Sequence, residues 1–131
     1  MSLLLALIEY GVSNGVLVGD GEDSYRDFTP EVPDAVTTFI EYSSNPVLPY
    51  VDCVHRSVQV KSRSMDAEAA RAKSLQLLGL FKSADESRRI DFSDTLWGQV
   101  YIRQTPFKLE QDTAGRVTYC FNLGITTNIL E

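Results

Sequence analysis

The spacing of apolar residues divides the chain into helix-like and strand-like stretches. Residues 2–13 predict a short helix, capped by Ser2 and ended by Asn14-Gly15, whose apolar side chains share one face: Leu4, Leu5, Ile8 and Val12. Residues 16–34 show no sustained period and are rich in Gly, Asp and Pro. They predict a long loop with room for a short strand at residues 16–18.

Two stretches alternate as strands do. Residues 35–43 are β-branched and aromatic with apolar bulk on both faces, which is typical of an inner strand. Residues 51–63 place Val54, Val58 and Val60 on one face and a polar set on the other, with Arg56 as an exception on the valine face. The prolines of SSNPVLPY, residues 43–50, predict a connecting arm between these strands.

A helix is predicted directly after the second strand. Ser64 or Asp66 can cap it, and one face carries the side chains expected to pack on a sheet: Ala67, Ala70, Ser74, Leu77, Leu78 and Phe81. A polar loop is expected at residues 82–89, followed by strands near 90–92, 95–105 and 116–127. Residues 112–115, Asp-Thr-Ala-Gly, supply a turn signal for a hairpin between the last two strands.

This order of elements predicts an α+β fold: a mainly antiparallel sheet with a helix packed on one face, plus a short N-terminal helix. A length of 131 residues fits a single domain, residues 1–131, with one core. Hydrophobic residues at 44% and charged residues at 23% are typical of a folded chain rather than a disordered one.

Charge and cysteine content narrow the classes of function. The formal net charge of −6 disfavours a partner held mainly by phosphate attraction. Cys53 and Cys120 are too few and too far apart for a disulfide framework, so they are expected to be reduced and buried. The N-terminal apolar run lacks a basic region and is interrupted by Glu9, so it predicts neither a signal peptide nor a membrane span.

No pattern indicates an enzyme, a cofactor or a metal site. The single histidine, His55, lies in a predicted strand without a nucleophile elbow, and the two cysteines lack zinc-ligand spacing. The acidic residues of the first loop do not follow the ligand order of an EF-hand and would repel phosphate: Asp20, Glu22, Asp23 and Asp27. We therefore expect no catalytic, cofactor-binding or metal-binding residue.

The cations do not form a clear nucleic-acid surface. Lys61 and Arg63 share one strand face, but Arg56 points the other way and the cations of the predicted helix alternate with acids. Tyr101 and Phe107 are conceivable stacking platforms, yet no RNA- or DNA-binding motif accompanies them. Direct recognition of nucleic acid is not expected.

Two motifs resemble the tail terminator and minor capsid proteins of long-tailed bacteriophages. The joint VQVKSRSMDAEAARAK, residues 58–73, is similar to the family's valine-rich strand that ends in arginine and runs into an alanine-rich helix. The stretch QTPFKLEQDTAGRVTYCFNL, residues 104–123, is similar to the segment before the family's aromatic-rich last strand and to that strand. Residues 35–131 fit in order, whereas the first 34 fit only as a short helix and a variable loop.

The resemblance implies a structural, non-enzymatic protein of the virion, placed at the tail-neck junction and assembled in the host cytoplasm. Such proteins form a ring, usually of six subunits, that caps the tail tube, stops its polymerisation and provides the docking surface for the head-neck connector. The implied partners are other copies of the chain, the tail tube protein and the head-tail connector, with no membrane. DNA would pass through the lumen without specific recognition, which an acidic wall suits because it repels phosphate.

Contacts with these partners are expected on loops and strand edges. Three segments are the candidates, namely the loop at 25–33, the arm at 46–50 and the hairpin at 106–116, with these residues as the interface set: Tyr25, Arg26, Phe28, Pro46, Val47, Leu48, Tyr50, Phe107, Lys108 and Arg116. Trp97 and Phe121 are expected in the core. Two alternatives stay open: a head-completion or tail-completion neck protein, and a small cytoplasmic binding or regulatory module.

Overall fold

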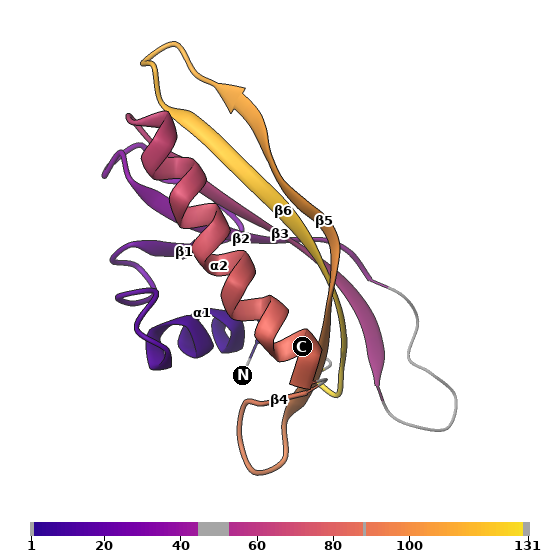
Figure 1. Cartoon of the computed structure of the whole chain (residues 1–131). Helices are drawn as coiled ribbons and strands as arrows, with labels where there is room; N and C mark the ends of the chain where they lie inside the picture. Colours follow the sequence, from indigo (N-terminus) through magenta and orange to yellow (C-terminus); the bar gives the residue numbers. More distant parts are fainter. Residues whose placement is uncertain (1, 45–52, 88, 130–131) are drawn as a thin grey trace.

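A computed structural model describes residues 2–44, 53–87 and 89–129 of the chain (Figure 1). The elements in chain order are α1 (Leu3–Ser13), β1 (Ser24–Arg26), β2 (Val36–Ser44), β3 (Val54–Ser64), α2 (Ala67–Ser87), β4 (Ile90–Asp91), β5 (Trp97–Gln111) and β6 (Val117–Thr127). Six strands form one sheet in the order β1-β2-β3-β6-β5-β4. β1 and β2 are parallel and the other neighbouring pairs are antiparallel, which confirms the predicted α+β class.

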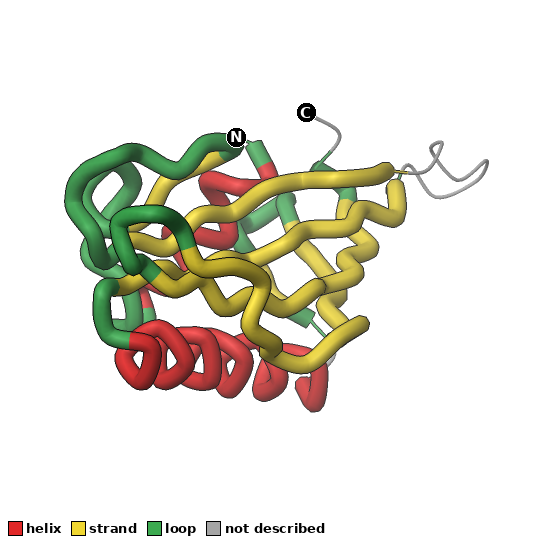
Figure 2. The backbone as a smooth tube through the Cα atoms, turned by 90° about the horizontal axis from the view of Figure 1, so that it is seen from above, coloured by secondary structure: helices red, strands yellow, loops and turns green. Residues whose placement is uncertain are grey.

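Both helices pack on one face of the sheet around a shared core. Figure 2 shows α2 as a layer beside the strands. The ring of Phe81 in α2 lies 6.3 Å from that of Phe39 in β2 and 6.0 Å from that of Tyr10 in α1, so it joins all three elements. Further apolar side chains of β3, β5 and β6 complete the core, and burying them is the main favourable contribution to folding: Val58, Val60, Val100, Phe121, Leu123 and Ile125.

The other face of the sheet, called here the open face, has no helix over it in the described part of the chain (Figure 1). The strand register places His55, Gln59 and Lys61 of β3 on this face, next to Thr126, Asn122 and Cys120 of β6. The alternation predicted for β3 is therefore confirmed, and Arg56 does fall on the valine face. There Arg56 forms an ion pair with Glu41 and donates a hydrogen bond to the carbonyl oxygen of Ile129 at 2.9 Å.

The predicted N-terminal helix is present, but its buried face was predicted only in part. Ser2 caps it as expected, because its Oγ accepts a hydrogen bond from the Leu5 amide at 3.2 Å. Val12 is exposed and Leu5 only half-buried, whereas the buried positions are Leu3, Leu4, Ala6, Leu7 and Ile8. Since all of residues 3–8 are apolar, the periodicity could not select the face that meets the sheet.

The first loop contains a strand, although not where room for one was predicted. Residues 16–18 are not a strand, and β1 occupies Ser24–Arg26 instead. It is held beside β2 by backbone hydrogen bonds from Thr37 N to the Asp23 carbonyl at 2.8 Å and from Asp27 N to the Phe39 carbonyl at 2.9 Å. The Asp23 carboxylate accepts from the amides of Val18 and Gly19, which keeps residues 18–23 in a turn.

Helix α2 begins as predicted and runs longer. Asp66 Oδ1 accepts from the Glu68 amide at 3.1 Å, and Ser64 Oγ accepts from the Asp66 amide at 3.2 Å. Its predicted stripe is buried at Ala70, Ser74, Leu77 and Phe81, half-buried at Leu78 and exposed at Ala67. The loop predicted for residues 82–89 was wrong for residues 82–87, because the helix continues to Ser87. A polar helical turn has the same composition as a loop, so composition alone did not separate the two.

Strand β5 also extends beyond its predicted end, to Gln111. Its pairing with β6 contains three register shifts, each of which inserts an extra residue into β5. Pro106 is tolerated there since β5 is paired through most of its length on one side only. Of the two aromatics expected in the core, Phe121 is fully buried, whereas Trp97 is half-buried with the Arg89 guanidinium over its ring.

Candidate docking surface

Two of the three predicted interface segments meet at one end of the sheet. Glu31, in the loop after β1, lies 3.0 Å from Arg116, at the base of the β5–β6 hairpin, measured from Oε1 to Nη2. The arm with the other four predicted residues lies outside the described residues: Pro46, Val47, Leu48 and Tyr50. The described candidate surface therefore consists of the loop and the hairpin.

The hairpin turn is built around the Asp112 carboxylate. Its Oδ1 accepts hydrogen bonds from the amides of Ala114 at 3.0 Å and Arg116 at 2.9 Å, and its Oδ2 accepts from Arg116 Nε at 2.7 Å. Gly115 takes a φ of 88°, which glycine adopts without strain. The hydrogen bond from the Arg116 amide is the largest cause that holds the pKa of Asp112 below its ordinary value.

The Arg116 side chain joins this turn to the loop after β1. Its Nη1 donates to the Glu31 carbonyl oxygen at 2.6 Å and lies 3.6 Å from Asp34 Oδ1, while the side chain is only 8% exposed. Hydrogen bonding to Asp112 is the first of the causes that raise the pKa of Arg116. This predicted interface residue thus organises the surface from within and offers little area of its own to a partner.

Arg63, at the end of β3, holds the same loop from the other side. Its Nη2 donates to the carbonyl oxygens of Pro30 at 2.7 Å and Pro33 at 2.8 Å, and its Nε donates to that of Asp34 at 3.0 Å. Burial, followed by the nearby charge of Arg116, lowers the pKa of Arg63. The two arginines fix the backbone of residues 30–34 with charge-assisted hydrogen bonds, which are stronger than neutral ones.

Ahead of this fixed segment, an aromatic pair reaches the surface. Tyr25 and Phe28 contact edge to face with ring centroids 5.8 Å apart, and Phe28 is 61% exposed. The Tyr25 hydroxyl donates to the Gly21 carbonyl oxygen at 3.1 Å, so Tyr25 is anchored to the turn that precedes it. An exposed aromatic ring on a well-held loop is a common anchor at protein interfaces.

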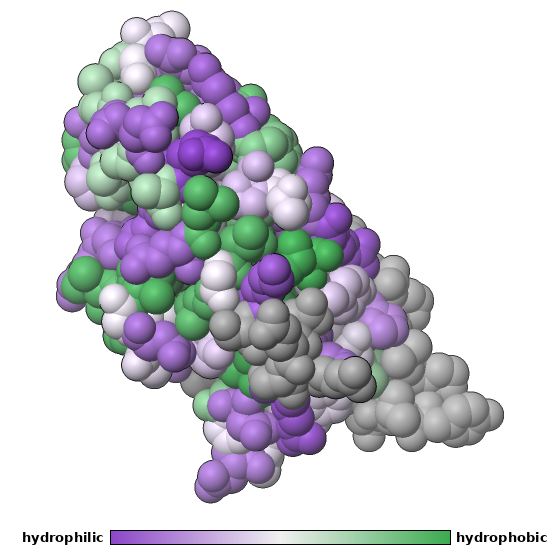
Figure 3. Space-filling model, viewed as in Figure 1, coloured by the Kyte–Doolittle hydropathy of each residue, from purple (hydrophilic) through white to green (hydrophobic). Residues whose placement is uncertain are grey.

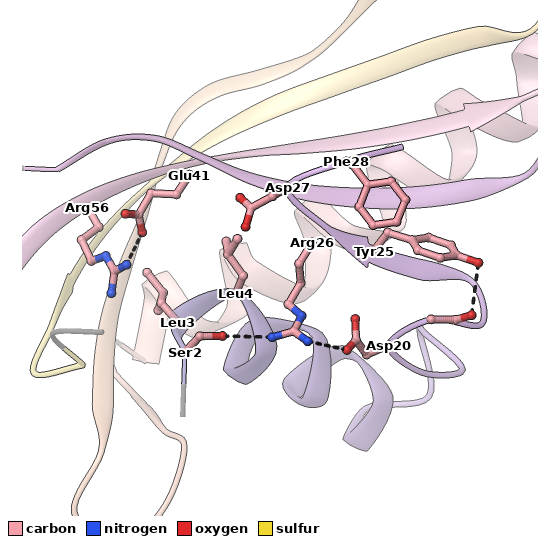
Figure 4. A pocket seen from close by; sticks show the side chains of 11 residues that line it. Ser2, Leu3, Leu4, Asp20, Tyr25, Arg26, Asp27, Phe28, Glu41 and Arg56 are labelled. Atoms are coloured by element: carbon pink, nitrogen blue, oxygen red, sulfur yellow. Dashed lines mark hydrogen bonds and ion pairs between the residues drawn. The ribbon is translucent and has the colours of Figure 1, made fainter. Parts of the chain in front are cut away.

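A cavity of about 690 Å³ lies beneath this pair, next to the start of α1 (Figure 4). Arg26 lines it, with Nη2 3.0 Å from Asp20 Oδ2 and Nη1 donating to Ser2 Oγ at 3.4 Å. Arg56 also lines it and is paired with Glu41. Asp27 adds a third carboxylate to the lining, at a residue with a φ of 67°. Carboxylates outnumber arginines here, so the cavity does not suit an anionic ligand.

The two predicted β5 residues lie on opposite faces of the strand. Phe107 pairs with Cys120 in register and is half-buried on the open face, whereas Lys108 pairs with Tyr119 and is exposed on the helix side. Beyond Gly98, no strand among the described residues pairs with the outer edge of β5. That edge is available to a partner, and its bulges and Pro106 make it irregular.

Other potential chemistry is sparse. No group of three or more histidine, cysteine or acidic residues in the described part of the chain could hold a metal ion. Cys53 and Cys120 are buried and free, as predicted, and burial raises the pKa of the Cys120 thiol, which keeps it protonated and unreactive. None of the helices, as far as the chain is described, is long and apolar enough to cross a membrane.

Two contacts in this region were not predicted from the sequence. Arg63 binds the loop at residues 30–34, and Glu41 forms an ion pair with Arg56. Arg63 binds main-chain carbonyl groups, which every residue carries, so no residue type could signal its role. The ion pair between Glu41 and Arg56, by contrast, could have been predicted from the sequence. Arg56 falls on an otherwise apolar strand face and Glu41 lies in the preceding strand, and a cation on such a face requires a partner.

A protein family described as bacteriophage tail terminator protein matches residues 12–129. The match covers all six strands and α2, and it contains both motifs that carried the resemblance. No match was found among curated proteins. A family match over nearly the whole chain agrees with the α+β fold described above, and the chain therefore belongs to the bacteriophage tail terminator family, a family of structural proteins of the phage tail and so of the virion.

Proposed function

We propose that this chain forms a ring, with six subunits, that caps the tail tube, stops its polymerisation and provides the surface on which the head-tail connector docks. The observation that carries the proposal is the tail terminator family match over residues 12–129. The partners are other copies of the chain, the tail tube protein and the connector. In this proposal the protein lies at the tail-neck junction, after assembly in the host cytoplasm.

The held loop and hairpin give the proposal a physical basis. A docking surface that is already ordered loses little conformational entropy when it binds. Arg63 and Arg116 supply that order, since they bind the loop backbone at residues 30–34 to the end of β3 and to the β5–β6 turn. Phe28 then presents an aromatic anchor beside it. We propose this loop and the hairpin turn at residues 112–116 as the contact surface for the tube or the connector.

Passage of DNA through such a ring fits the charge of the chain. The formal net charge is −6, and residues 16–35 contain six carboxylates and one arginine. A negatively charged wall repels the phosphate backbone, so DNA can pass through the ring without binding to it. In this proposal the protein makes no sequence-specific contact with the DNA.

A phage that lacks this chain tests the proposal. It should produce tails of abnormal length or tails without heads, and supplying the wild-type chain should restore tails of uniform length, as counted by negative-stain electron microscopy. Filled heads beside separate tails of normal length would instead assign the chain to head or tail completion. A chain that stays monomeric even with tail tubes present would favour a small binding module and contradict the ring.

A further inference from the structure

Opposite edges of the sheet carry complementary surfaces. At the β1 edge lies the acidic corner, defined as Asp20, Glu22, Asp27 and the neighbouring Val18. At the other side lies the basic edge, defined as Arg103 and Lys108 of β5 with Arg71 and Lys82 of α2. β1 is the first strand in the sheet order and β5 the fifth, so the two surfaces lie at opposite sides of the subunit (Figure 1).

The acidic corner is exposed and held in shape. Asp20, Glu22 and Asp27 are exposed, and Arg26, which pairs with Asp20, is the one cation within residues 16–35. Val18, which is 66% exposed, adds apolar area beside these charges. A charged rim around exposed apolar side chains is typical of a surface that another protein covers.

The basic edge follows from how α2 sits on the sheet. Lys73 donates from Nζ to the Val16 carbonyl oxygen at 2.7 Å, so its flank of the helix faces the β1 side. Arg71, Leu75 and Lys82 share the opposite flank, toward β5, and all three are exposed. Apolar surface is visible along the α2 face of the molecule in Figure 3, and Leu75 is 44% exposed.

Strand β5 adds two further cations to this edge. Lys108 points to the α2 side, and Arg103 lies on the open face over the Tyr101 ring, 5.3 Å from its centroid. Among the described side chains beside α2 and the part of β5 beyond its pairing with β4, two carboxylates also lie on this side, Glu68 on the same flank of α2 and Glu110 on the open face near the hairpin. The four cations outnumber them, which gives the edge the opposite sign to the acidic corner.

We propose that the acidic corner of one copy of this chain docks on the basic edge of the next copy, and that this joint builds the ring. Pairing of like surfaces about a twofold axis would bring acid against acid, which charge repulsion opposes. A head-to-tail joint uses one surface of each kind and leaves one of each free, so it repeats until a ring closes. The unpaired backbone of β5 lies within the joint and can add hydrogen bonds. The inference rests on the ring of the proposed function and names the surfaces that form it.

Single charge reversals of the full chain test the joint. Glu22→Lys alters the acidic corner and Lys108→Glu alters the basic edge. Asp94→Lys and Lys61→Glu are the matched controls, because they make the same changes of net charge outside both surfaces. Self-association is measured by sedimentation velocity, for the free chain and for the chain bound to purified tail tubes. Glu22→Lys and Lys108→Glu should each weaken association at least about tenfold, more so at low salt, and the controls should not.

Mixing the two altered chains gives the sharper result. Glu22→Lys retains a normal basic edge and Lys108→Glu a normal acidic corner, so an equimolar mixture should form heterodimers. The swapped charges at the remaining pair of surfaces attract again, which lets these heterodimers close into rings. No association in the mixture, or normal rings from either altered chain alone, would overturn the joint. If those altered chains still produced tails of normal length, the terminator function would stand without this joint. Failure of the wild-type chain to oligomerise either alone or on tubes would overturn both proposals.

Discussion

Arg63 at the end of β3 and Arg116 in the β5–β6 turn bind neighbouring carbonyl groups of one loop. Arg63 donates to the carbonyl oxygens of Pro30 and Pro33, and Arg116 donates to that of Glu31 between them. The loop at residues 30–34 carries little apolar core of its own, so these guanidinium groups replace hydrophobic burial as its attachment. Several consequences can be measured without the rest of the virion.

Replacing Arg63 should loosen this loop. Arg63→Ala removes four hydrogen bonds to backbone carbonyl groups and should lower the free energy of unfolding by about 1–3 kcal/mol. Amide hydrogen exchange in residues 29–35 should become faster than in the rest of the sheet. Arg63→Lys should rescue only part of the effect since an ammonium group lacks the planar fork. Exposed Arg71→Ala is the control, and equal exchange rates in it and Arg63→Ala would contradict the attachment.

Asp112 should contribute to stability in a pH-dependent way. Its pKa in the folded protein lies below the ordinary 3.8, first because of the hydrogen bond from the Arg116 amide. A carboxylate with a depressed folded-state pKa stabilises the fold above its unfolded-state pKa, and this contribution disappears as the pH falls through the folded-state pKa. Urea unfolding between pH 6 and the acid limit of solubility should therefore show a smaller loss for Asp112→Asn than for the wild-type chain. Asp94→Asn, at an exposed position away from this turn, is the control, and identical curves for Asp112→Asn and the wild-type chain would contradict this role.

Replacing Gly124 by alanine should lower the stability of the fold. A Cβ at this position would lie 2.2 Å from Tyr101 Cε2 and 2.6 Å from Arg103 Nε. Because the Tyr101 ring lies on the open face, it can swing aside, and Gly124→Ala should cost about 1 kcal/mol of stability through lost ring contacts. In a double-mutant cycle, Gly124→Ala in a Tyr101→Ala background should cost much less. Additive losses would show that the ring and the glycine are not coupled.

Phe81 should be the most sensitive position of α2. It is fully buried between the Phe39 and Tyr10 rings, so Phe81→Ala should leave a cavity and cost about 3–5 kcal/mol. Leu75→Ala on the exposed flank should change stability by no more than about 0.5 kcal/mol. Chemical denaturation compares the two, and a tolerant Phe81 would contradict the position of α2 on the core.

Phe28 should matter for docking and little for folding. Since its ring is 61% exposed and contacts Tyr25 only at the edge, Phe28→Ser should cost at most about 1 kcal/mol of stability. Under the proposed function it should reduce binding to tail tubes in a co-sedimentation assay. Val12→Ser is the comparison, since Val12 is an exposed apolar residue of α1 and not of the loop at residues 25–33. Equal binding by both variants would remove Phe28 from the contact surface.

The fold could be predicted where a periodic pattern met a clear boundary. Ser64 and Asp66 marked the start of α2, and the alternation of β3 identified the face on which Arg56 lies. Patterns failed where several structures share one composition. The apolar residues 3–8 fit any helix face, and the polar residues 82–87 fit a solvated helix as well as a loop.

The candidate surface was predictable as segments and not as an arrangement. The loop and the hairpin were both expected at an interface, but their attachment through Glu31 and Arg116 joins residues 85 positions apart. Contacts to backbone carbonyls leave no trace in residue types. Arg116 was consequently predicted to face a partner, whereas its guanidinium is used within the subunit.

The extra residues of β5 determine which length changes this protein can accept. Ile102 points into the core, yet Gln104 and Glu110 register with Asn122 and Thr118 on the open face, so counting alternate positions along β5 selects the wrong surface residues. Removing one residue from β5 can eliminate a bulge and leave the remaining pairs in place. β6 contains no extra residue that could absorb a deletion. Removing one residue from β6 would therefore turn Leu123 and Ile125 out of the core. The fold should therefore tolerate single-residue insertions and deletions in β5, whereas the same changes in β6 should unfold the protein.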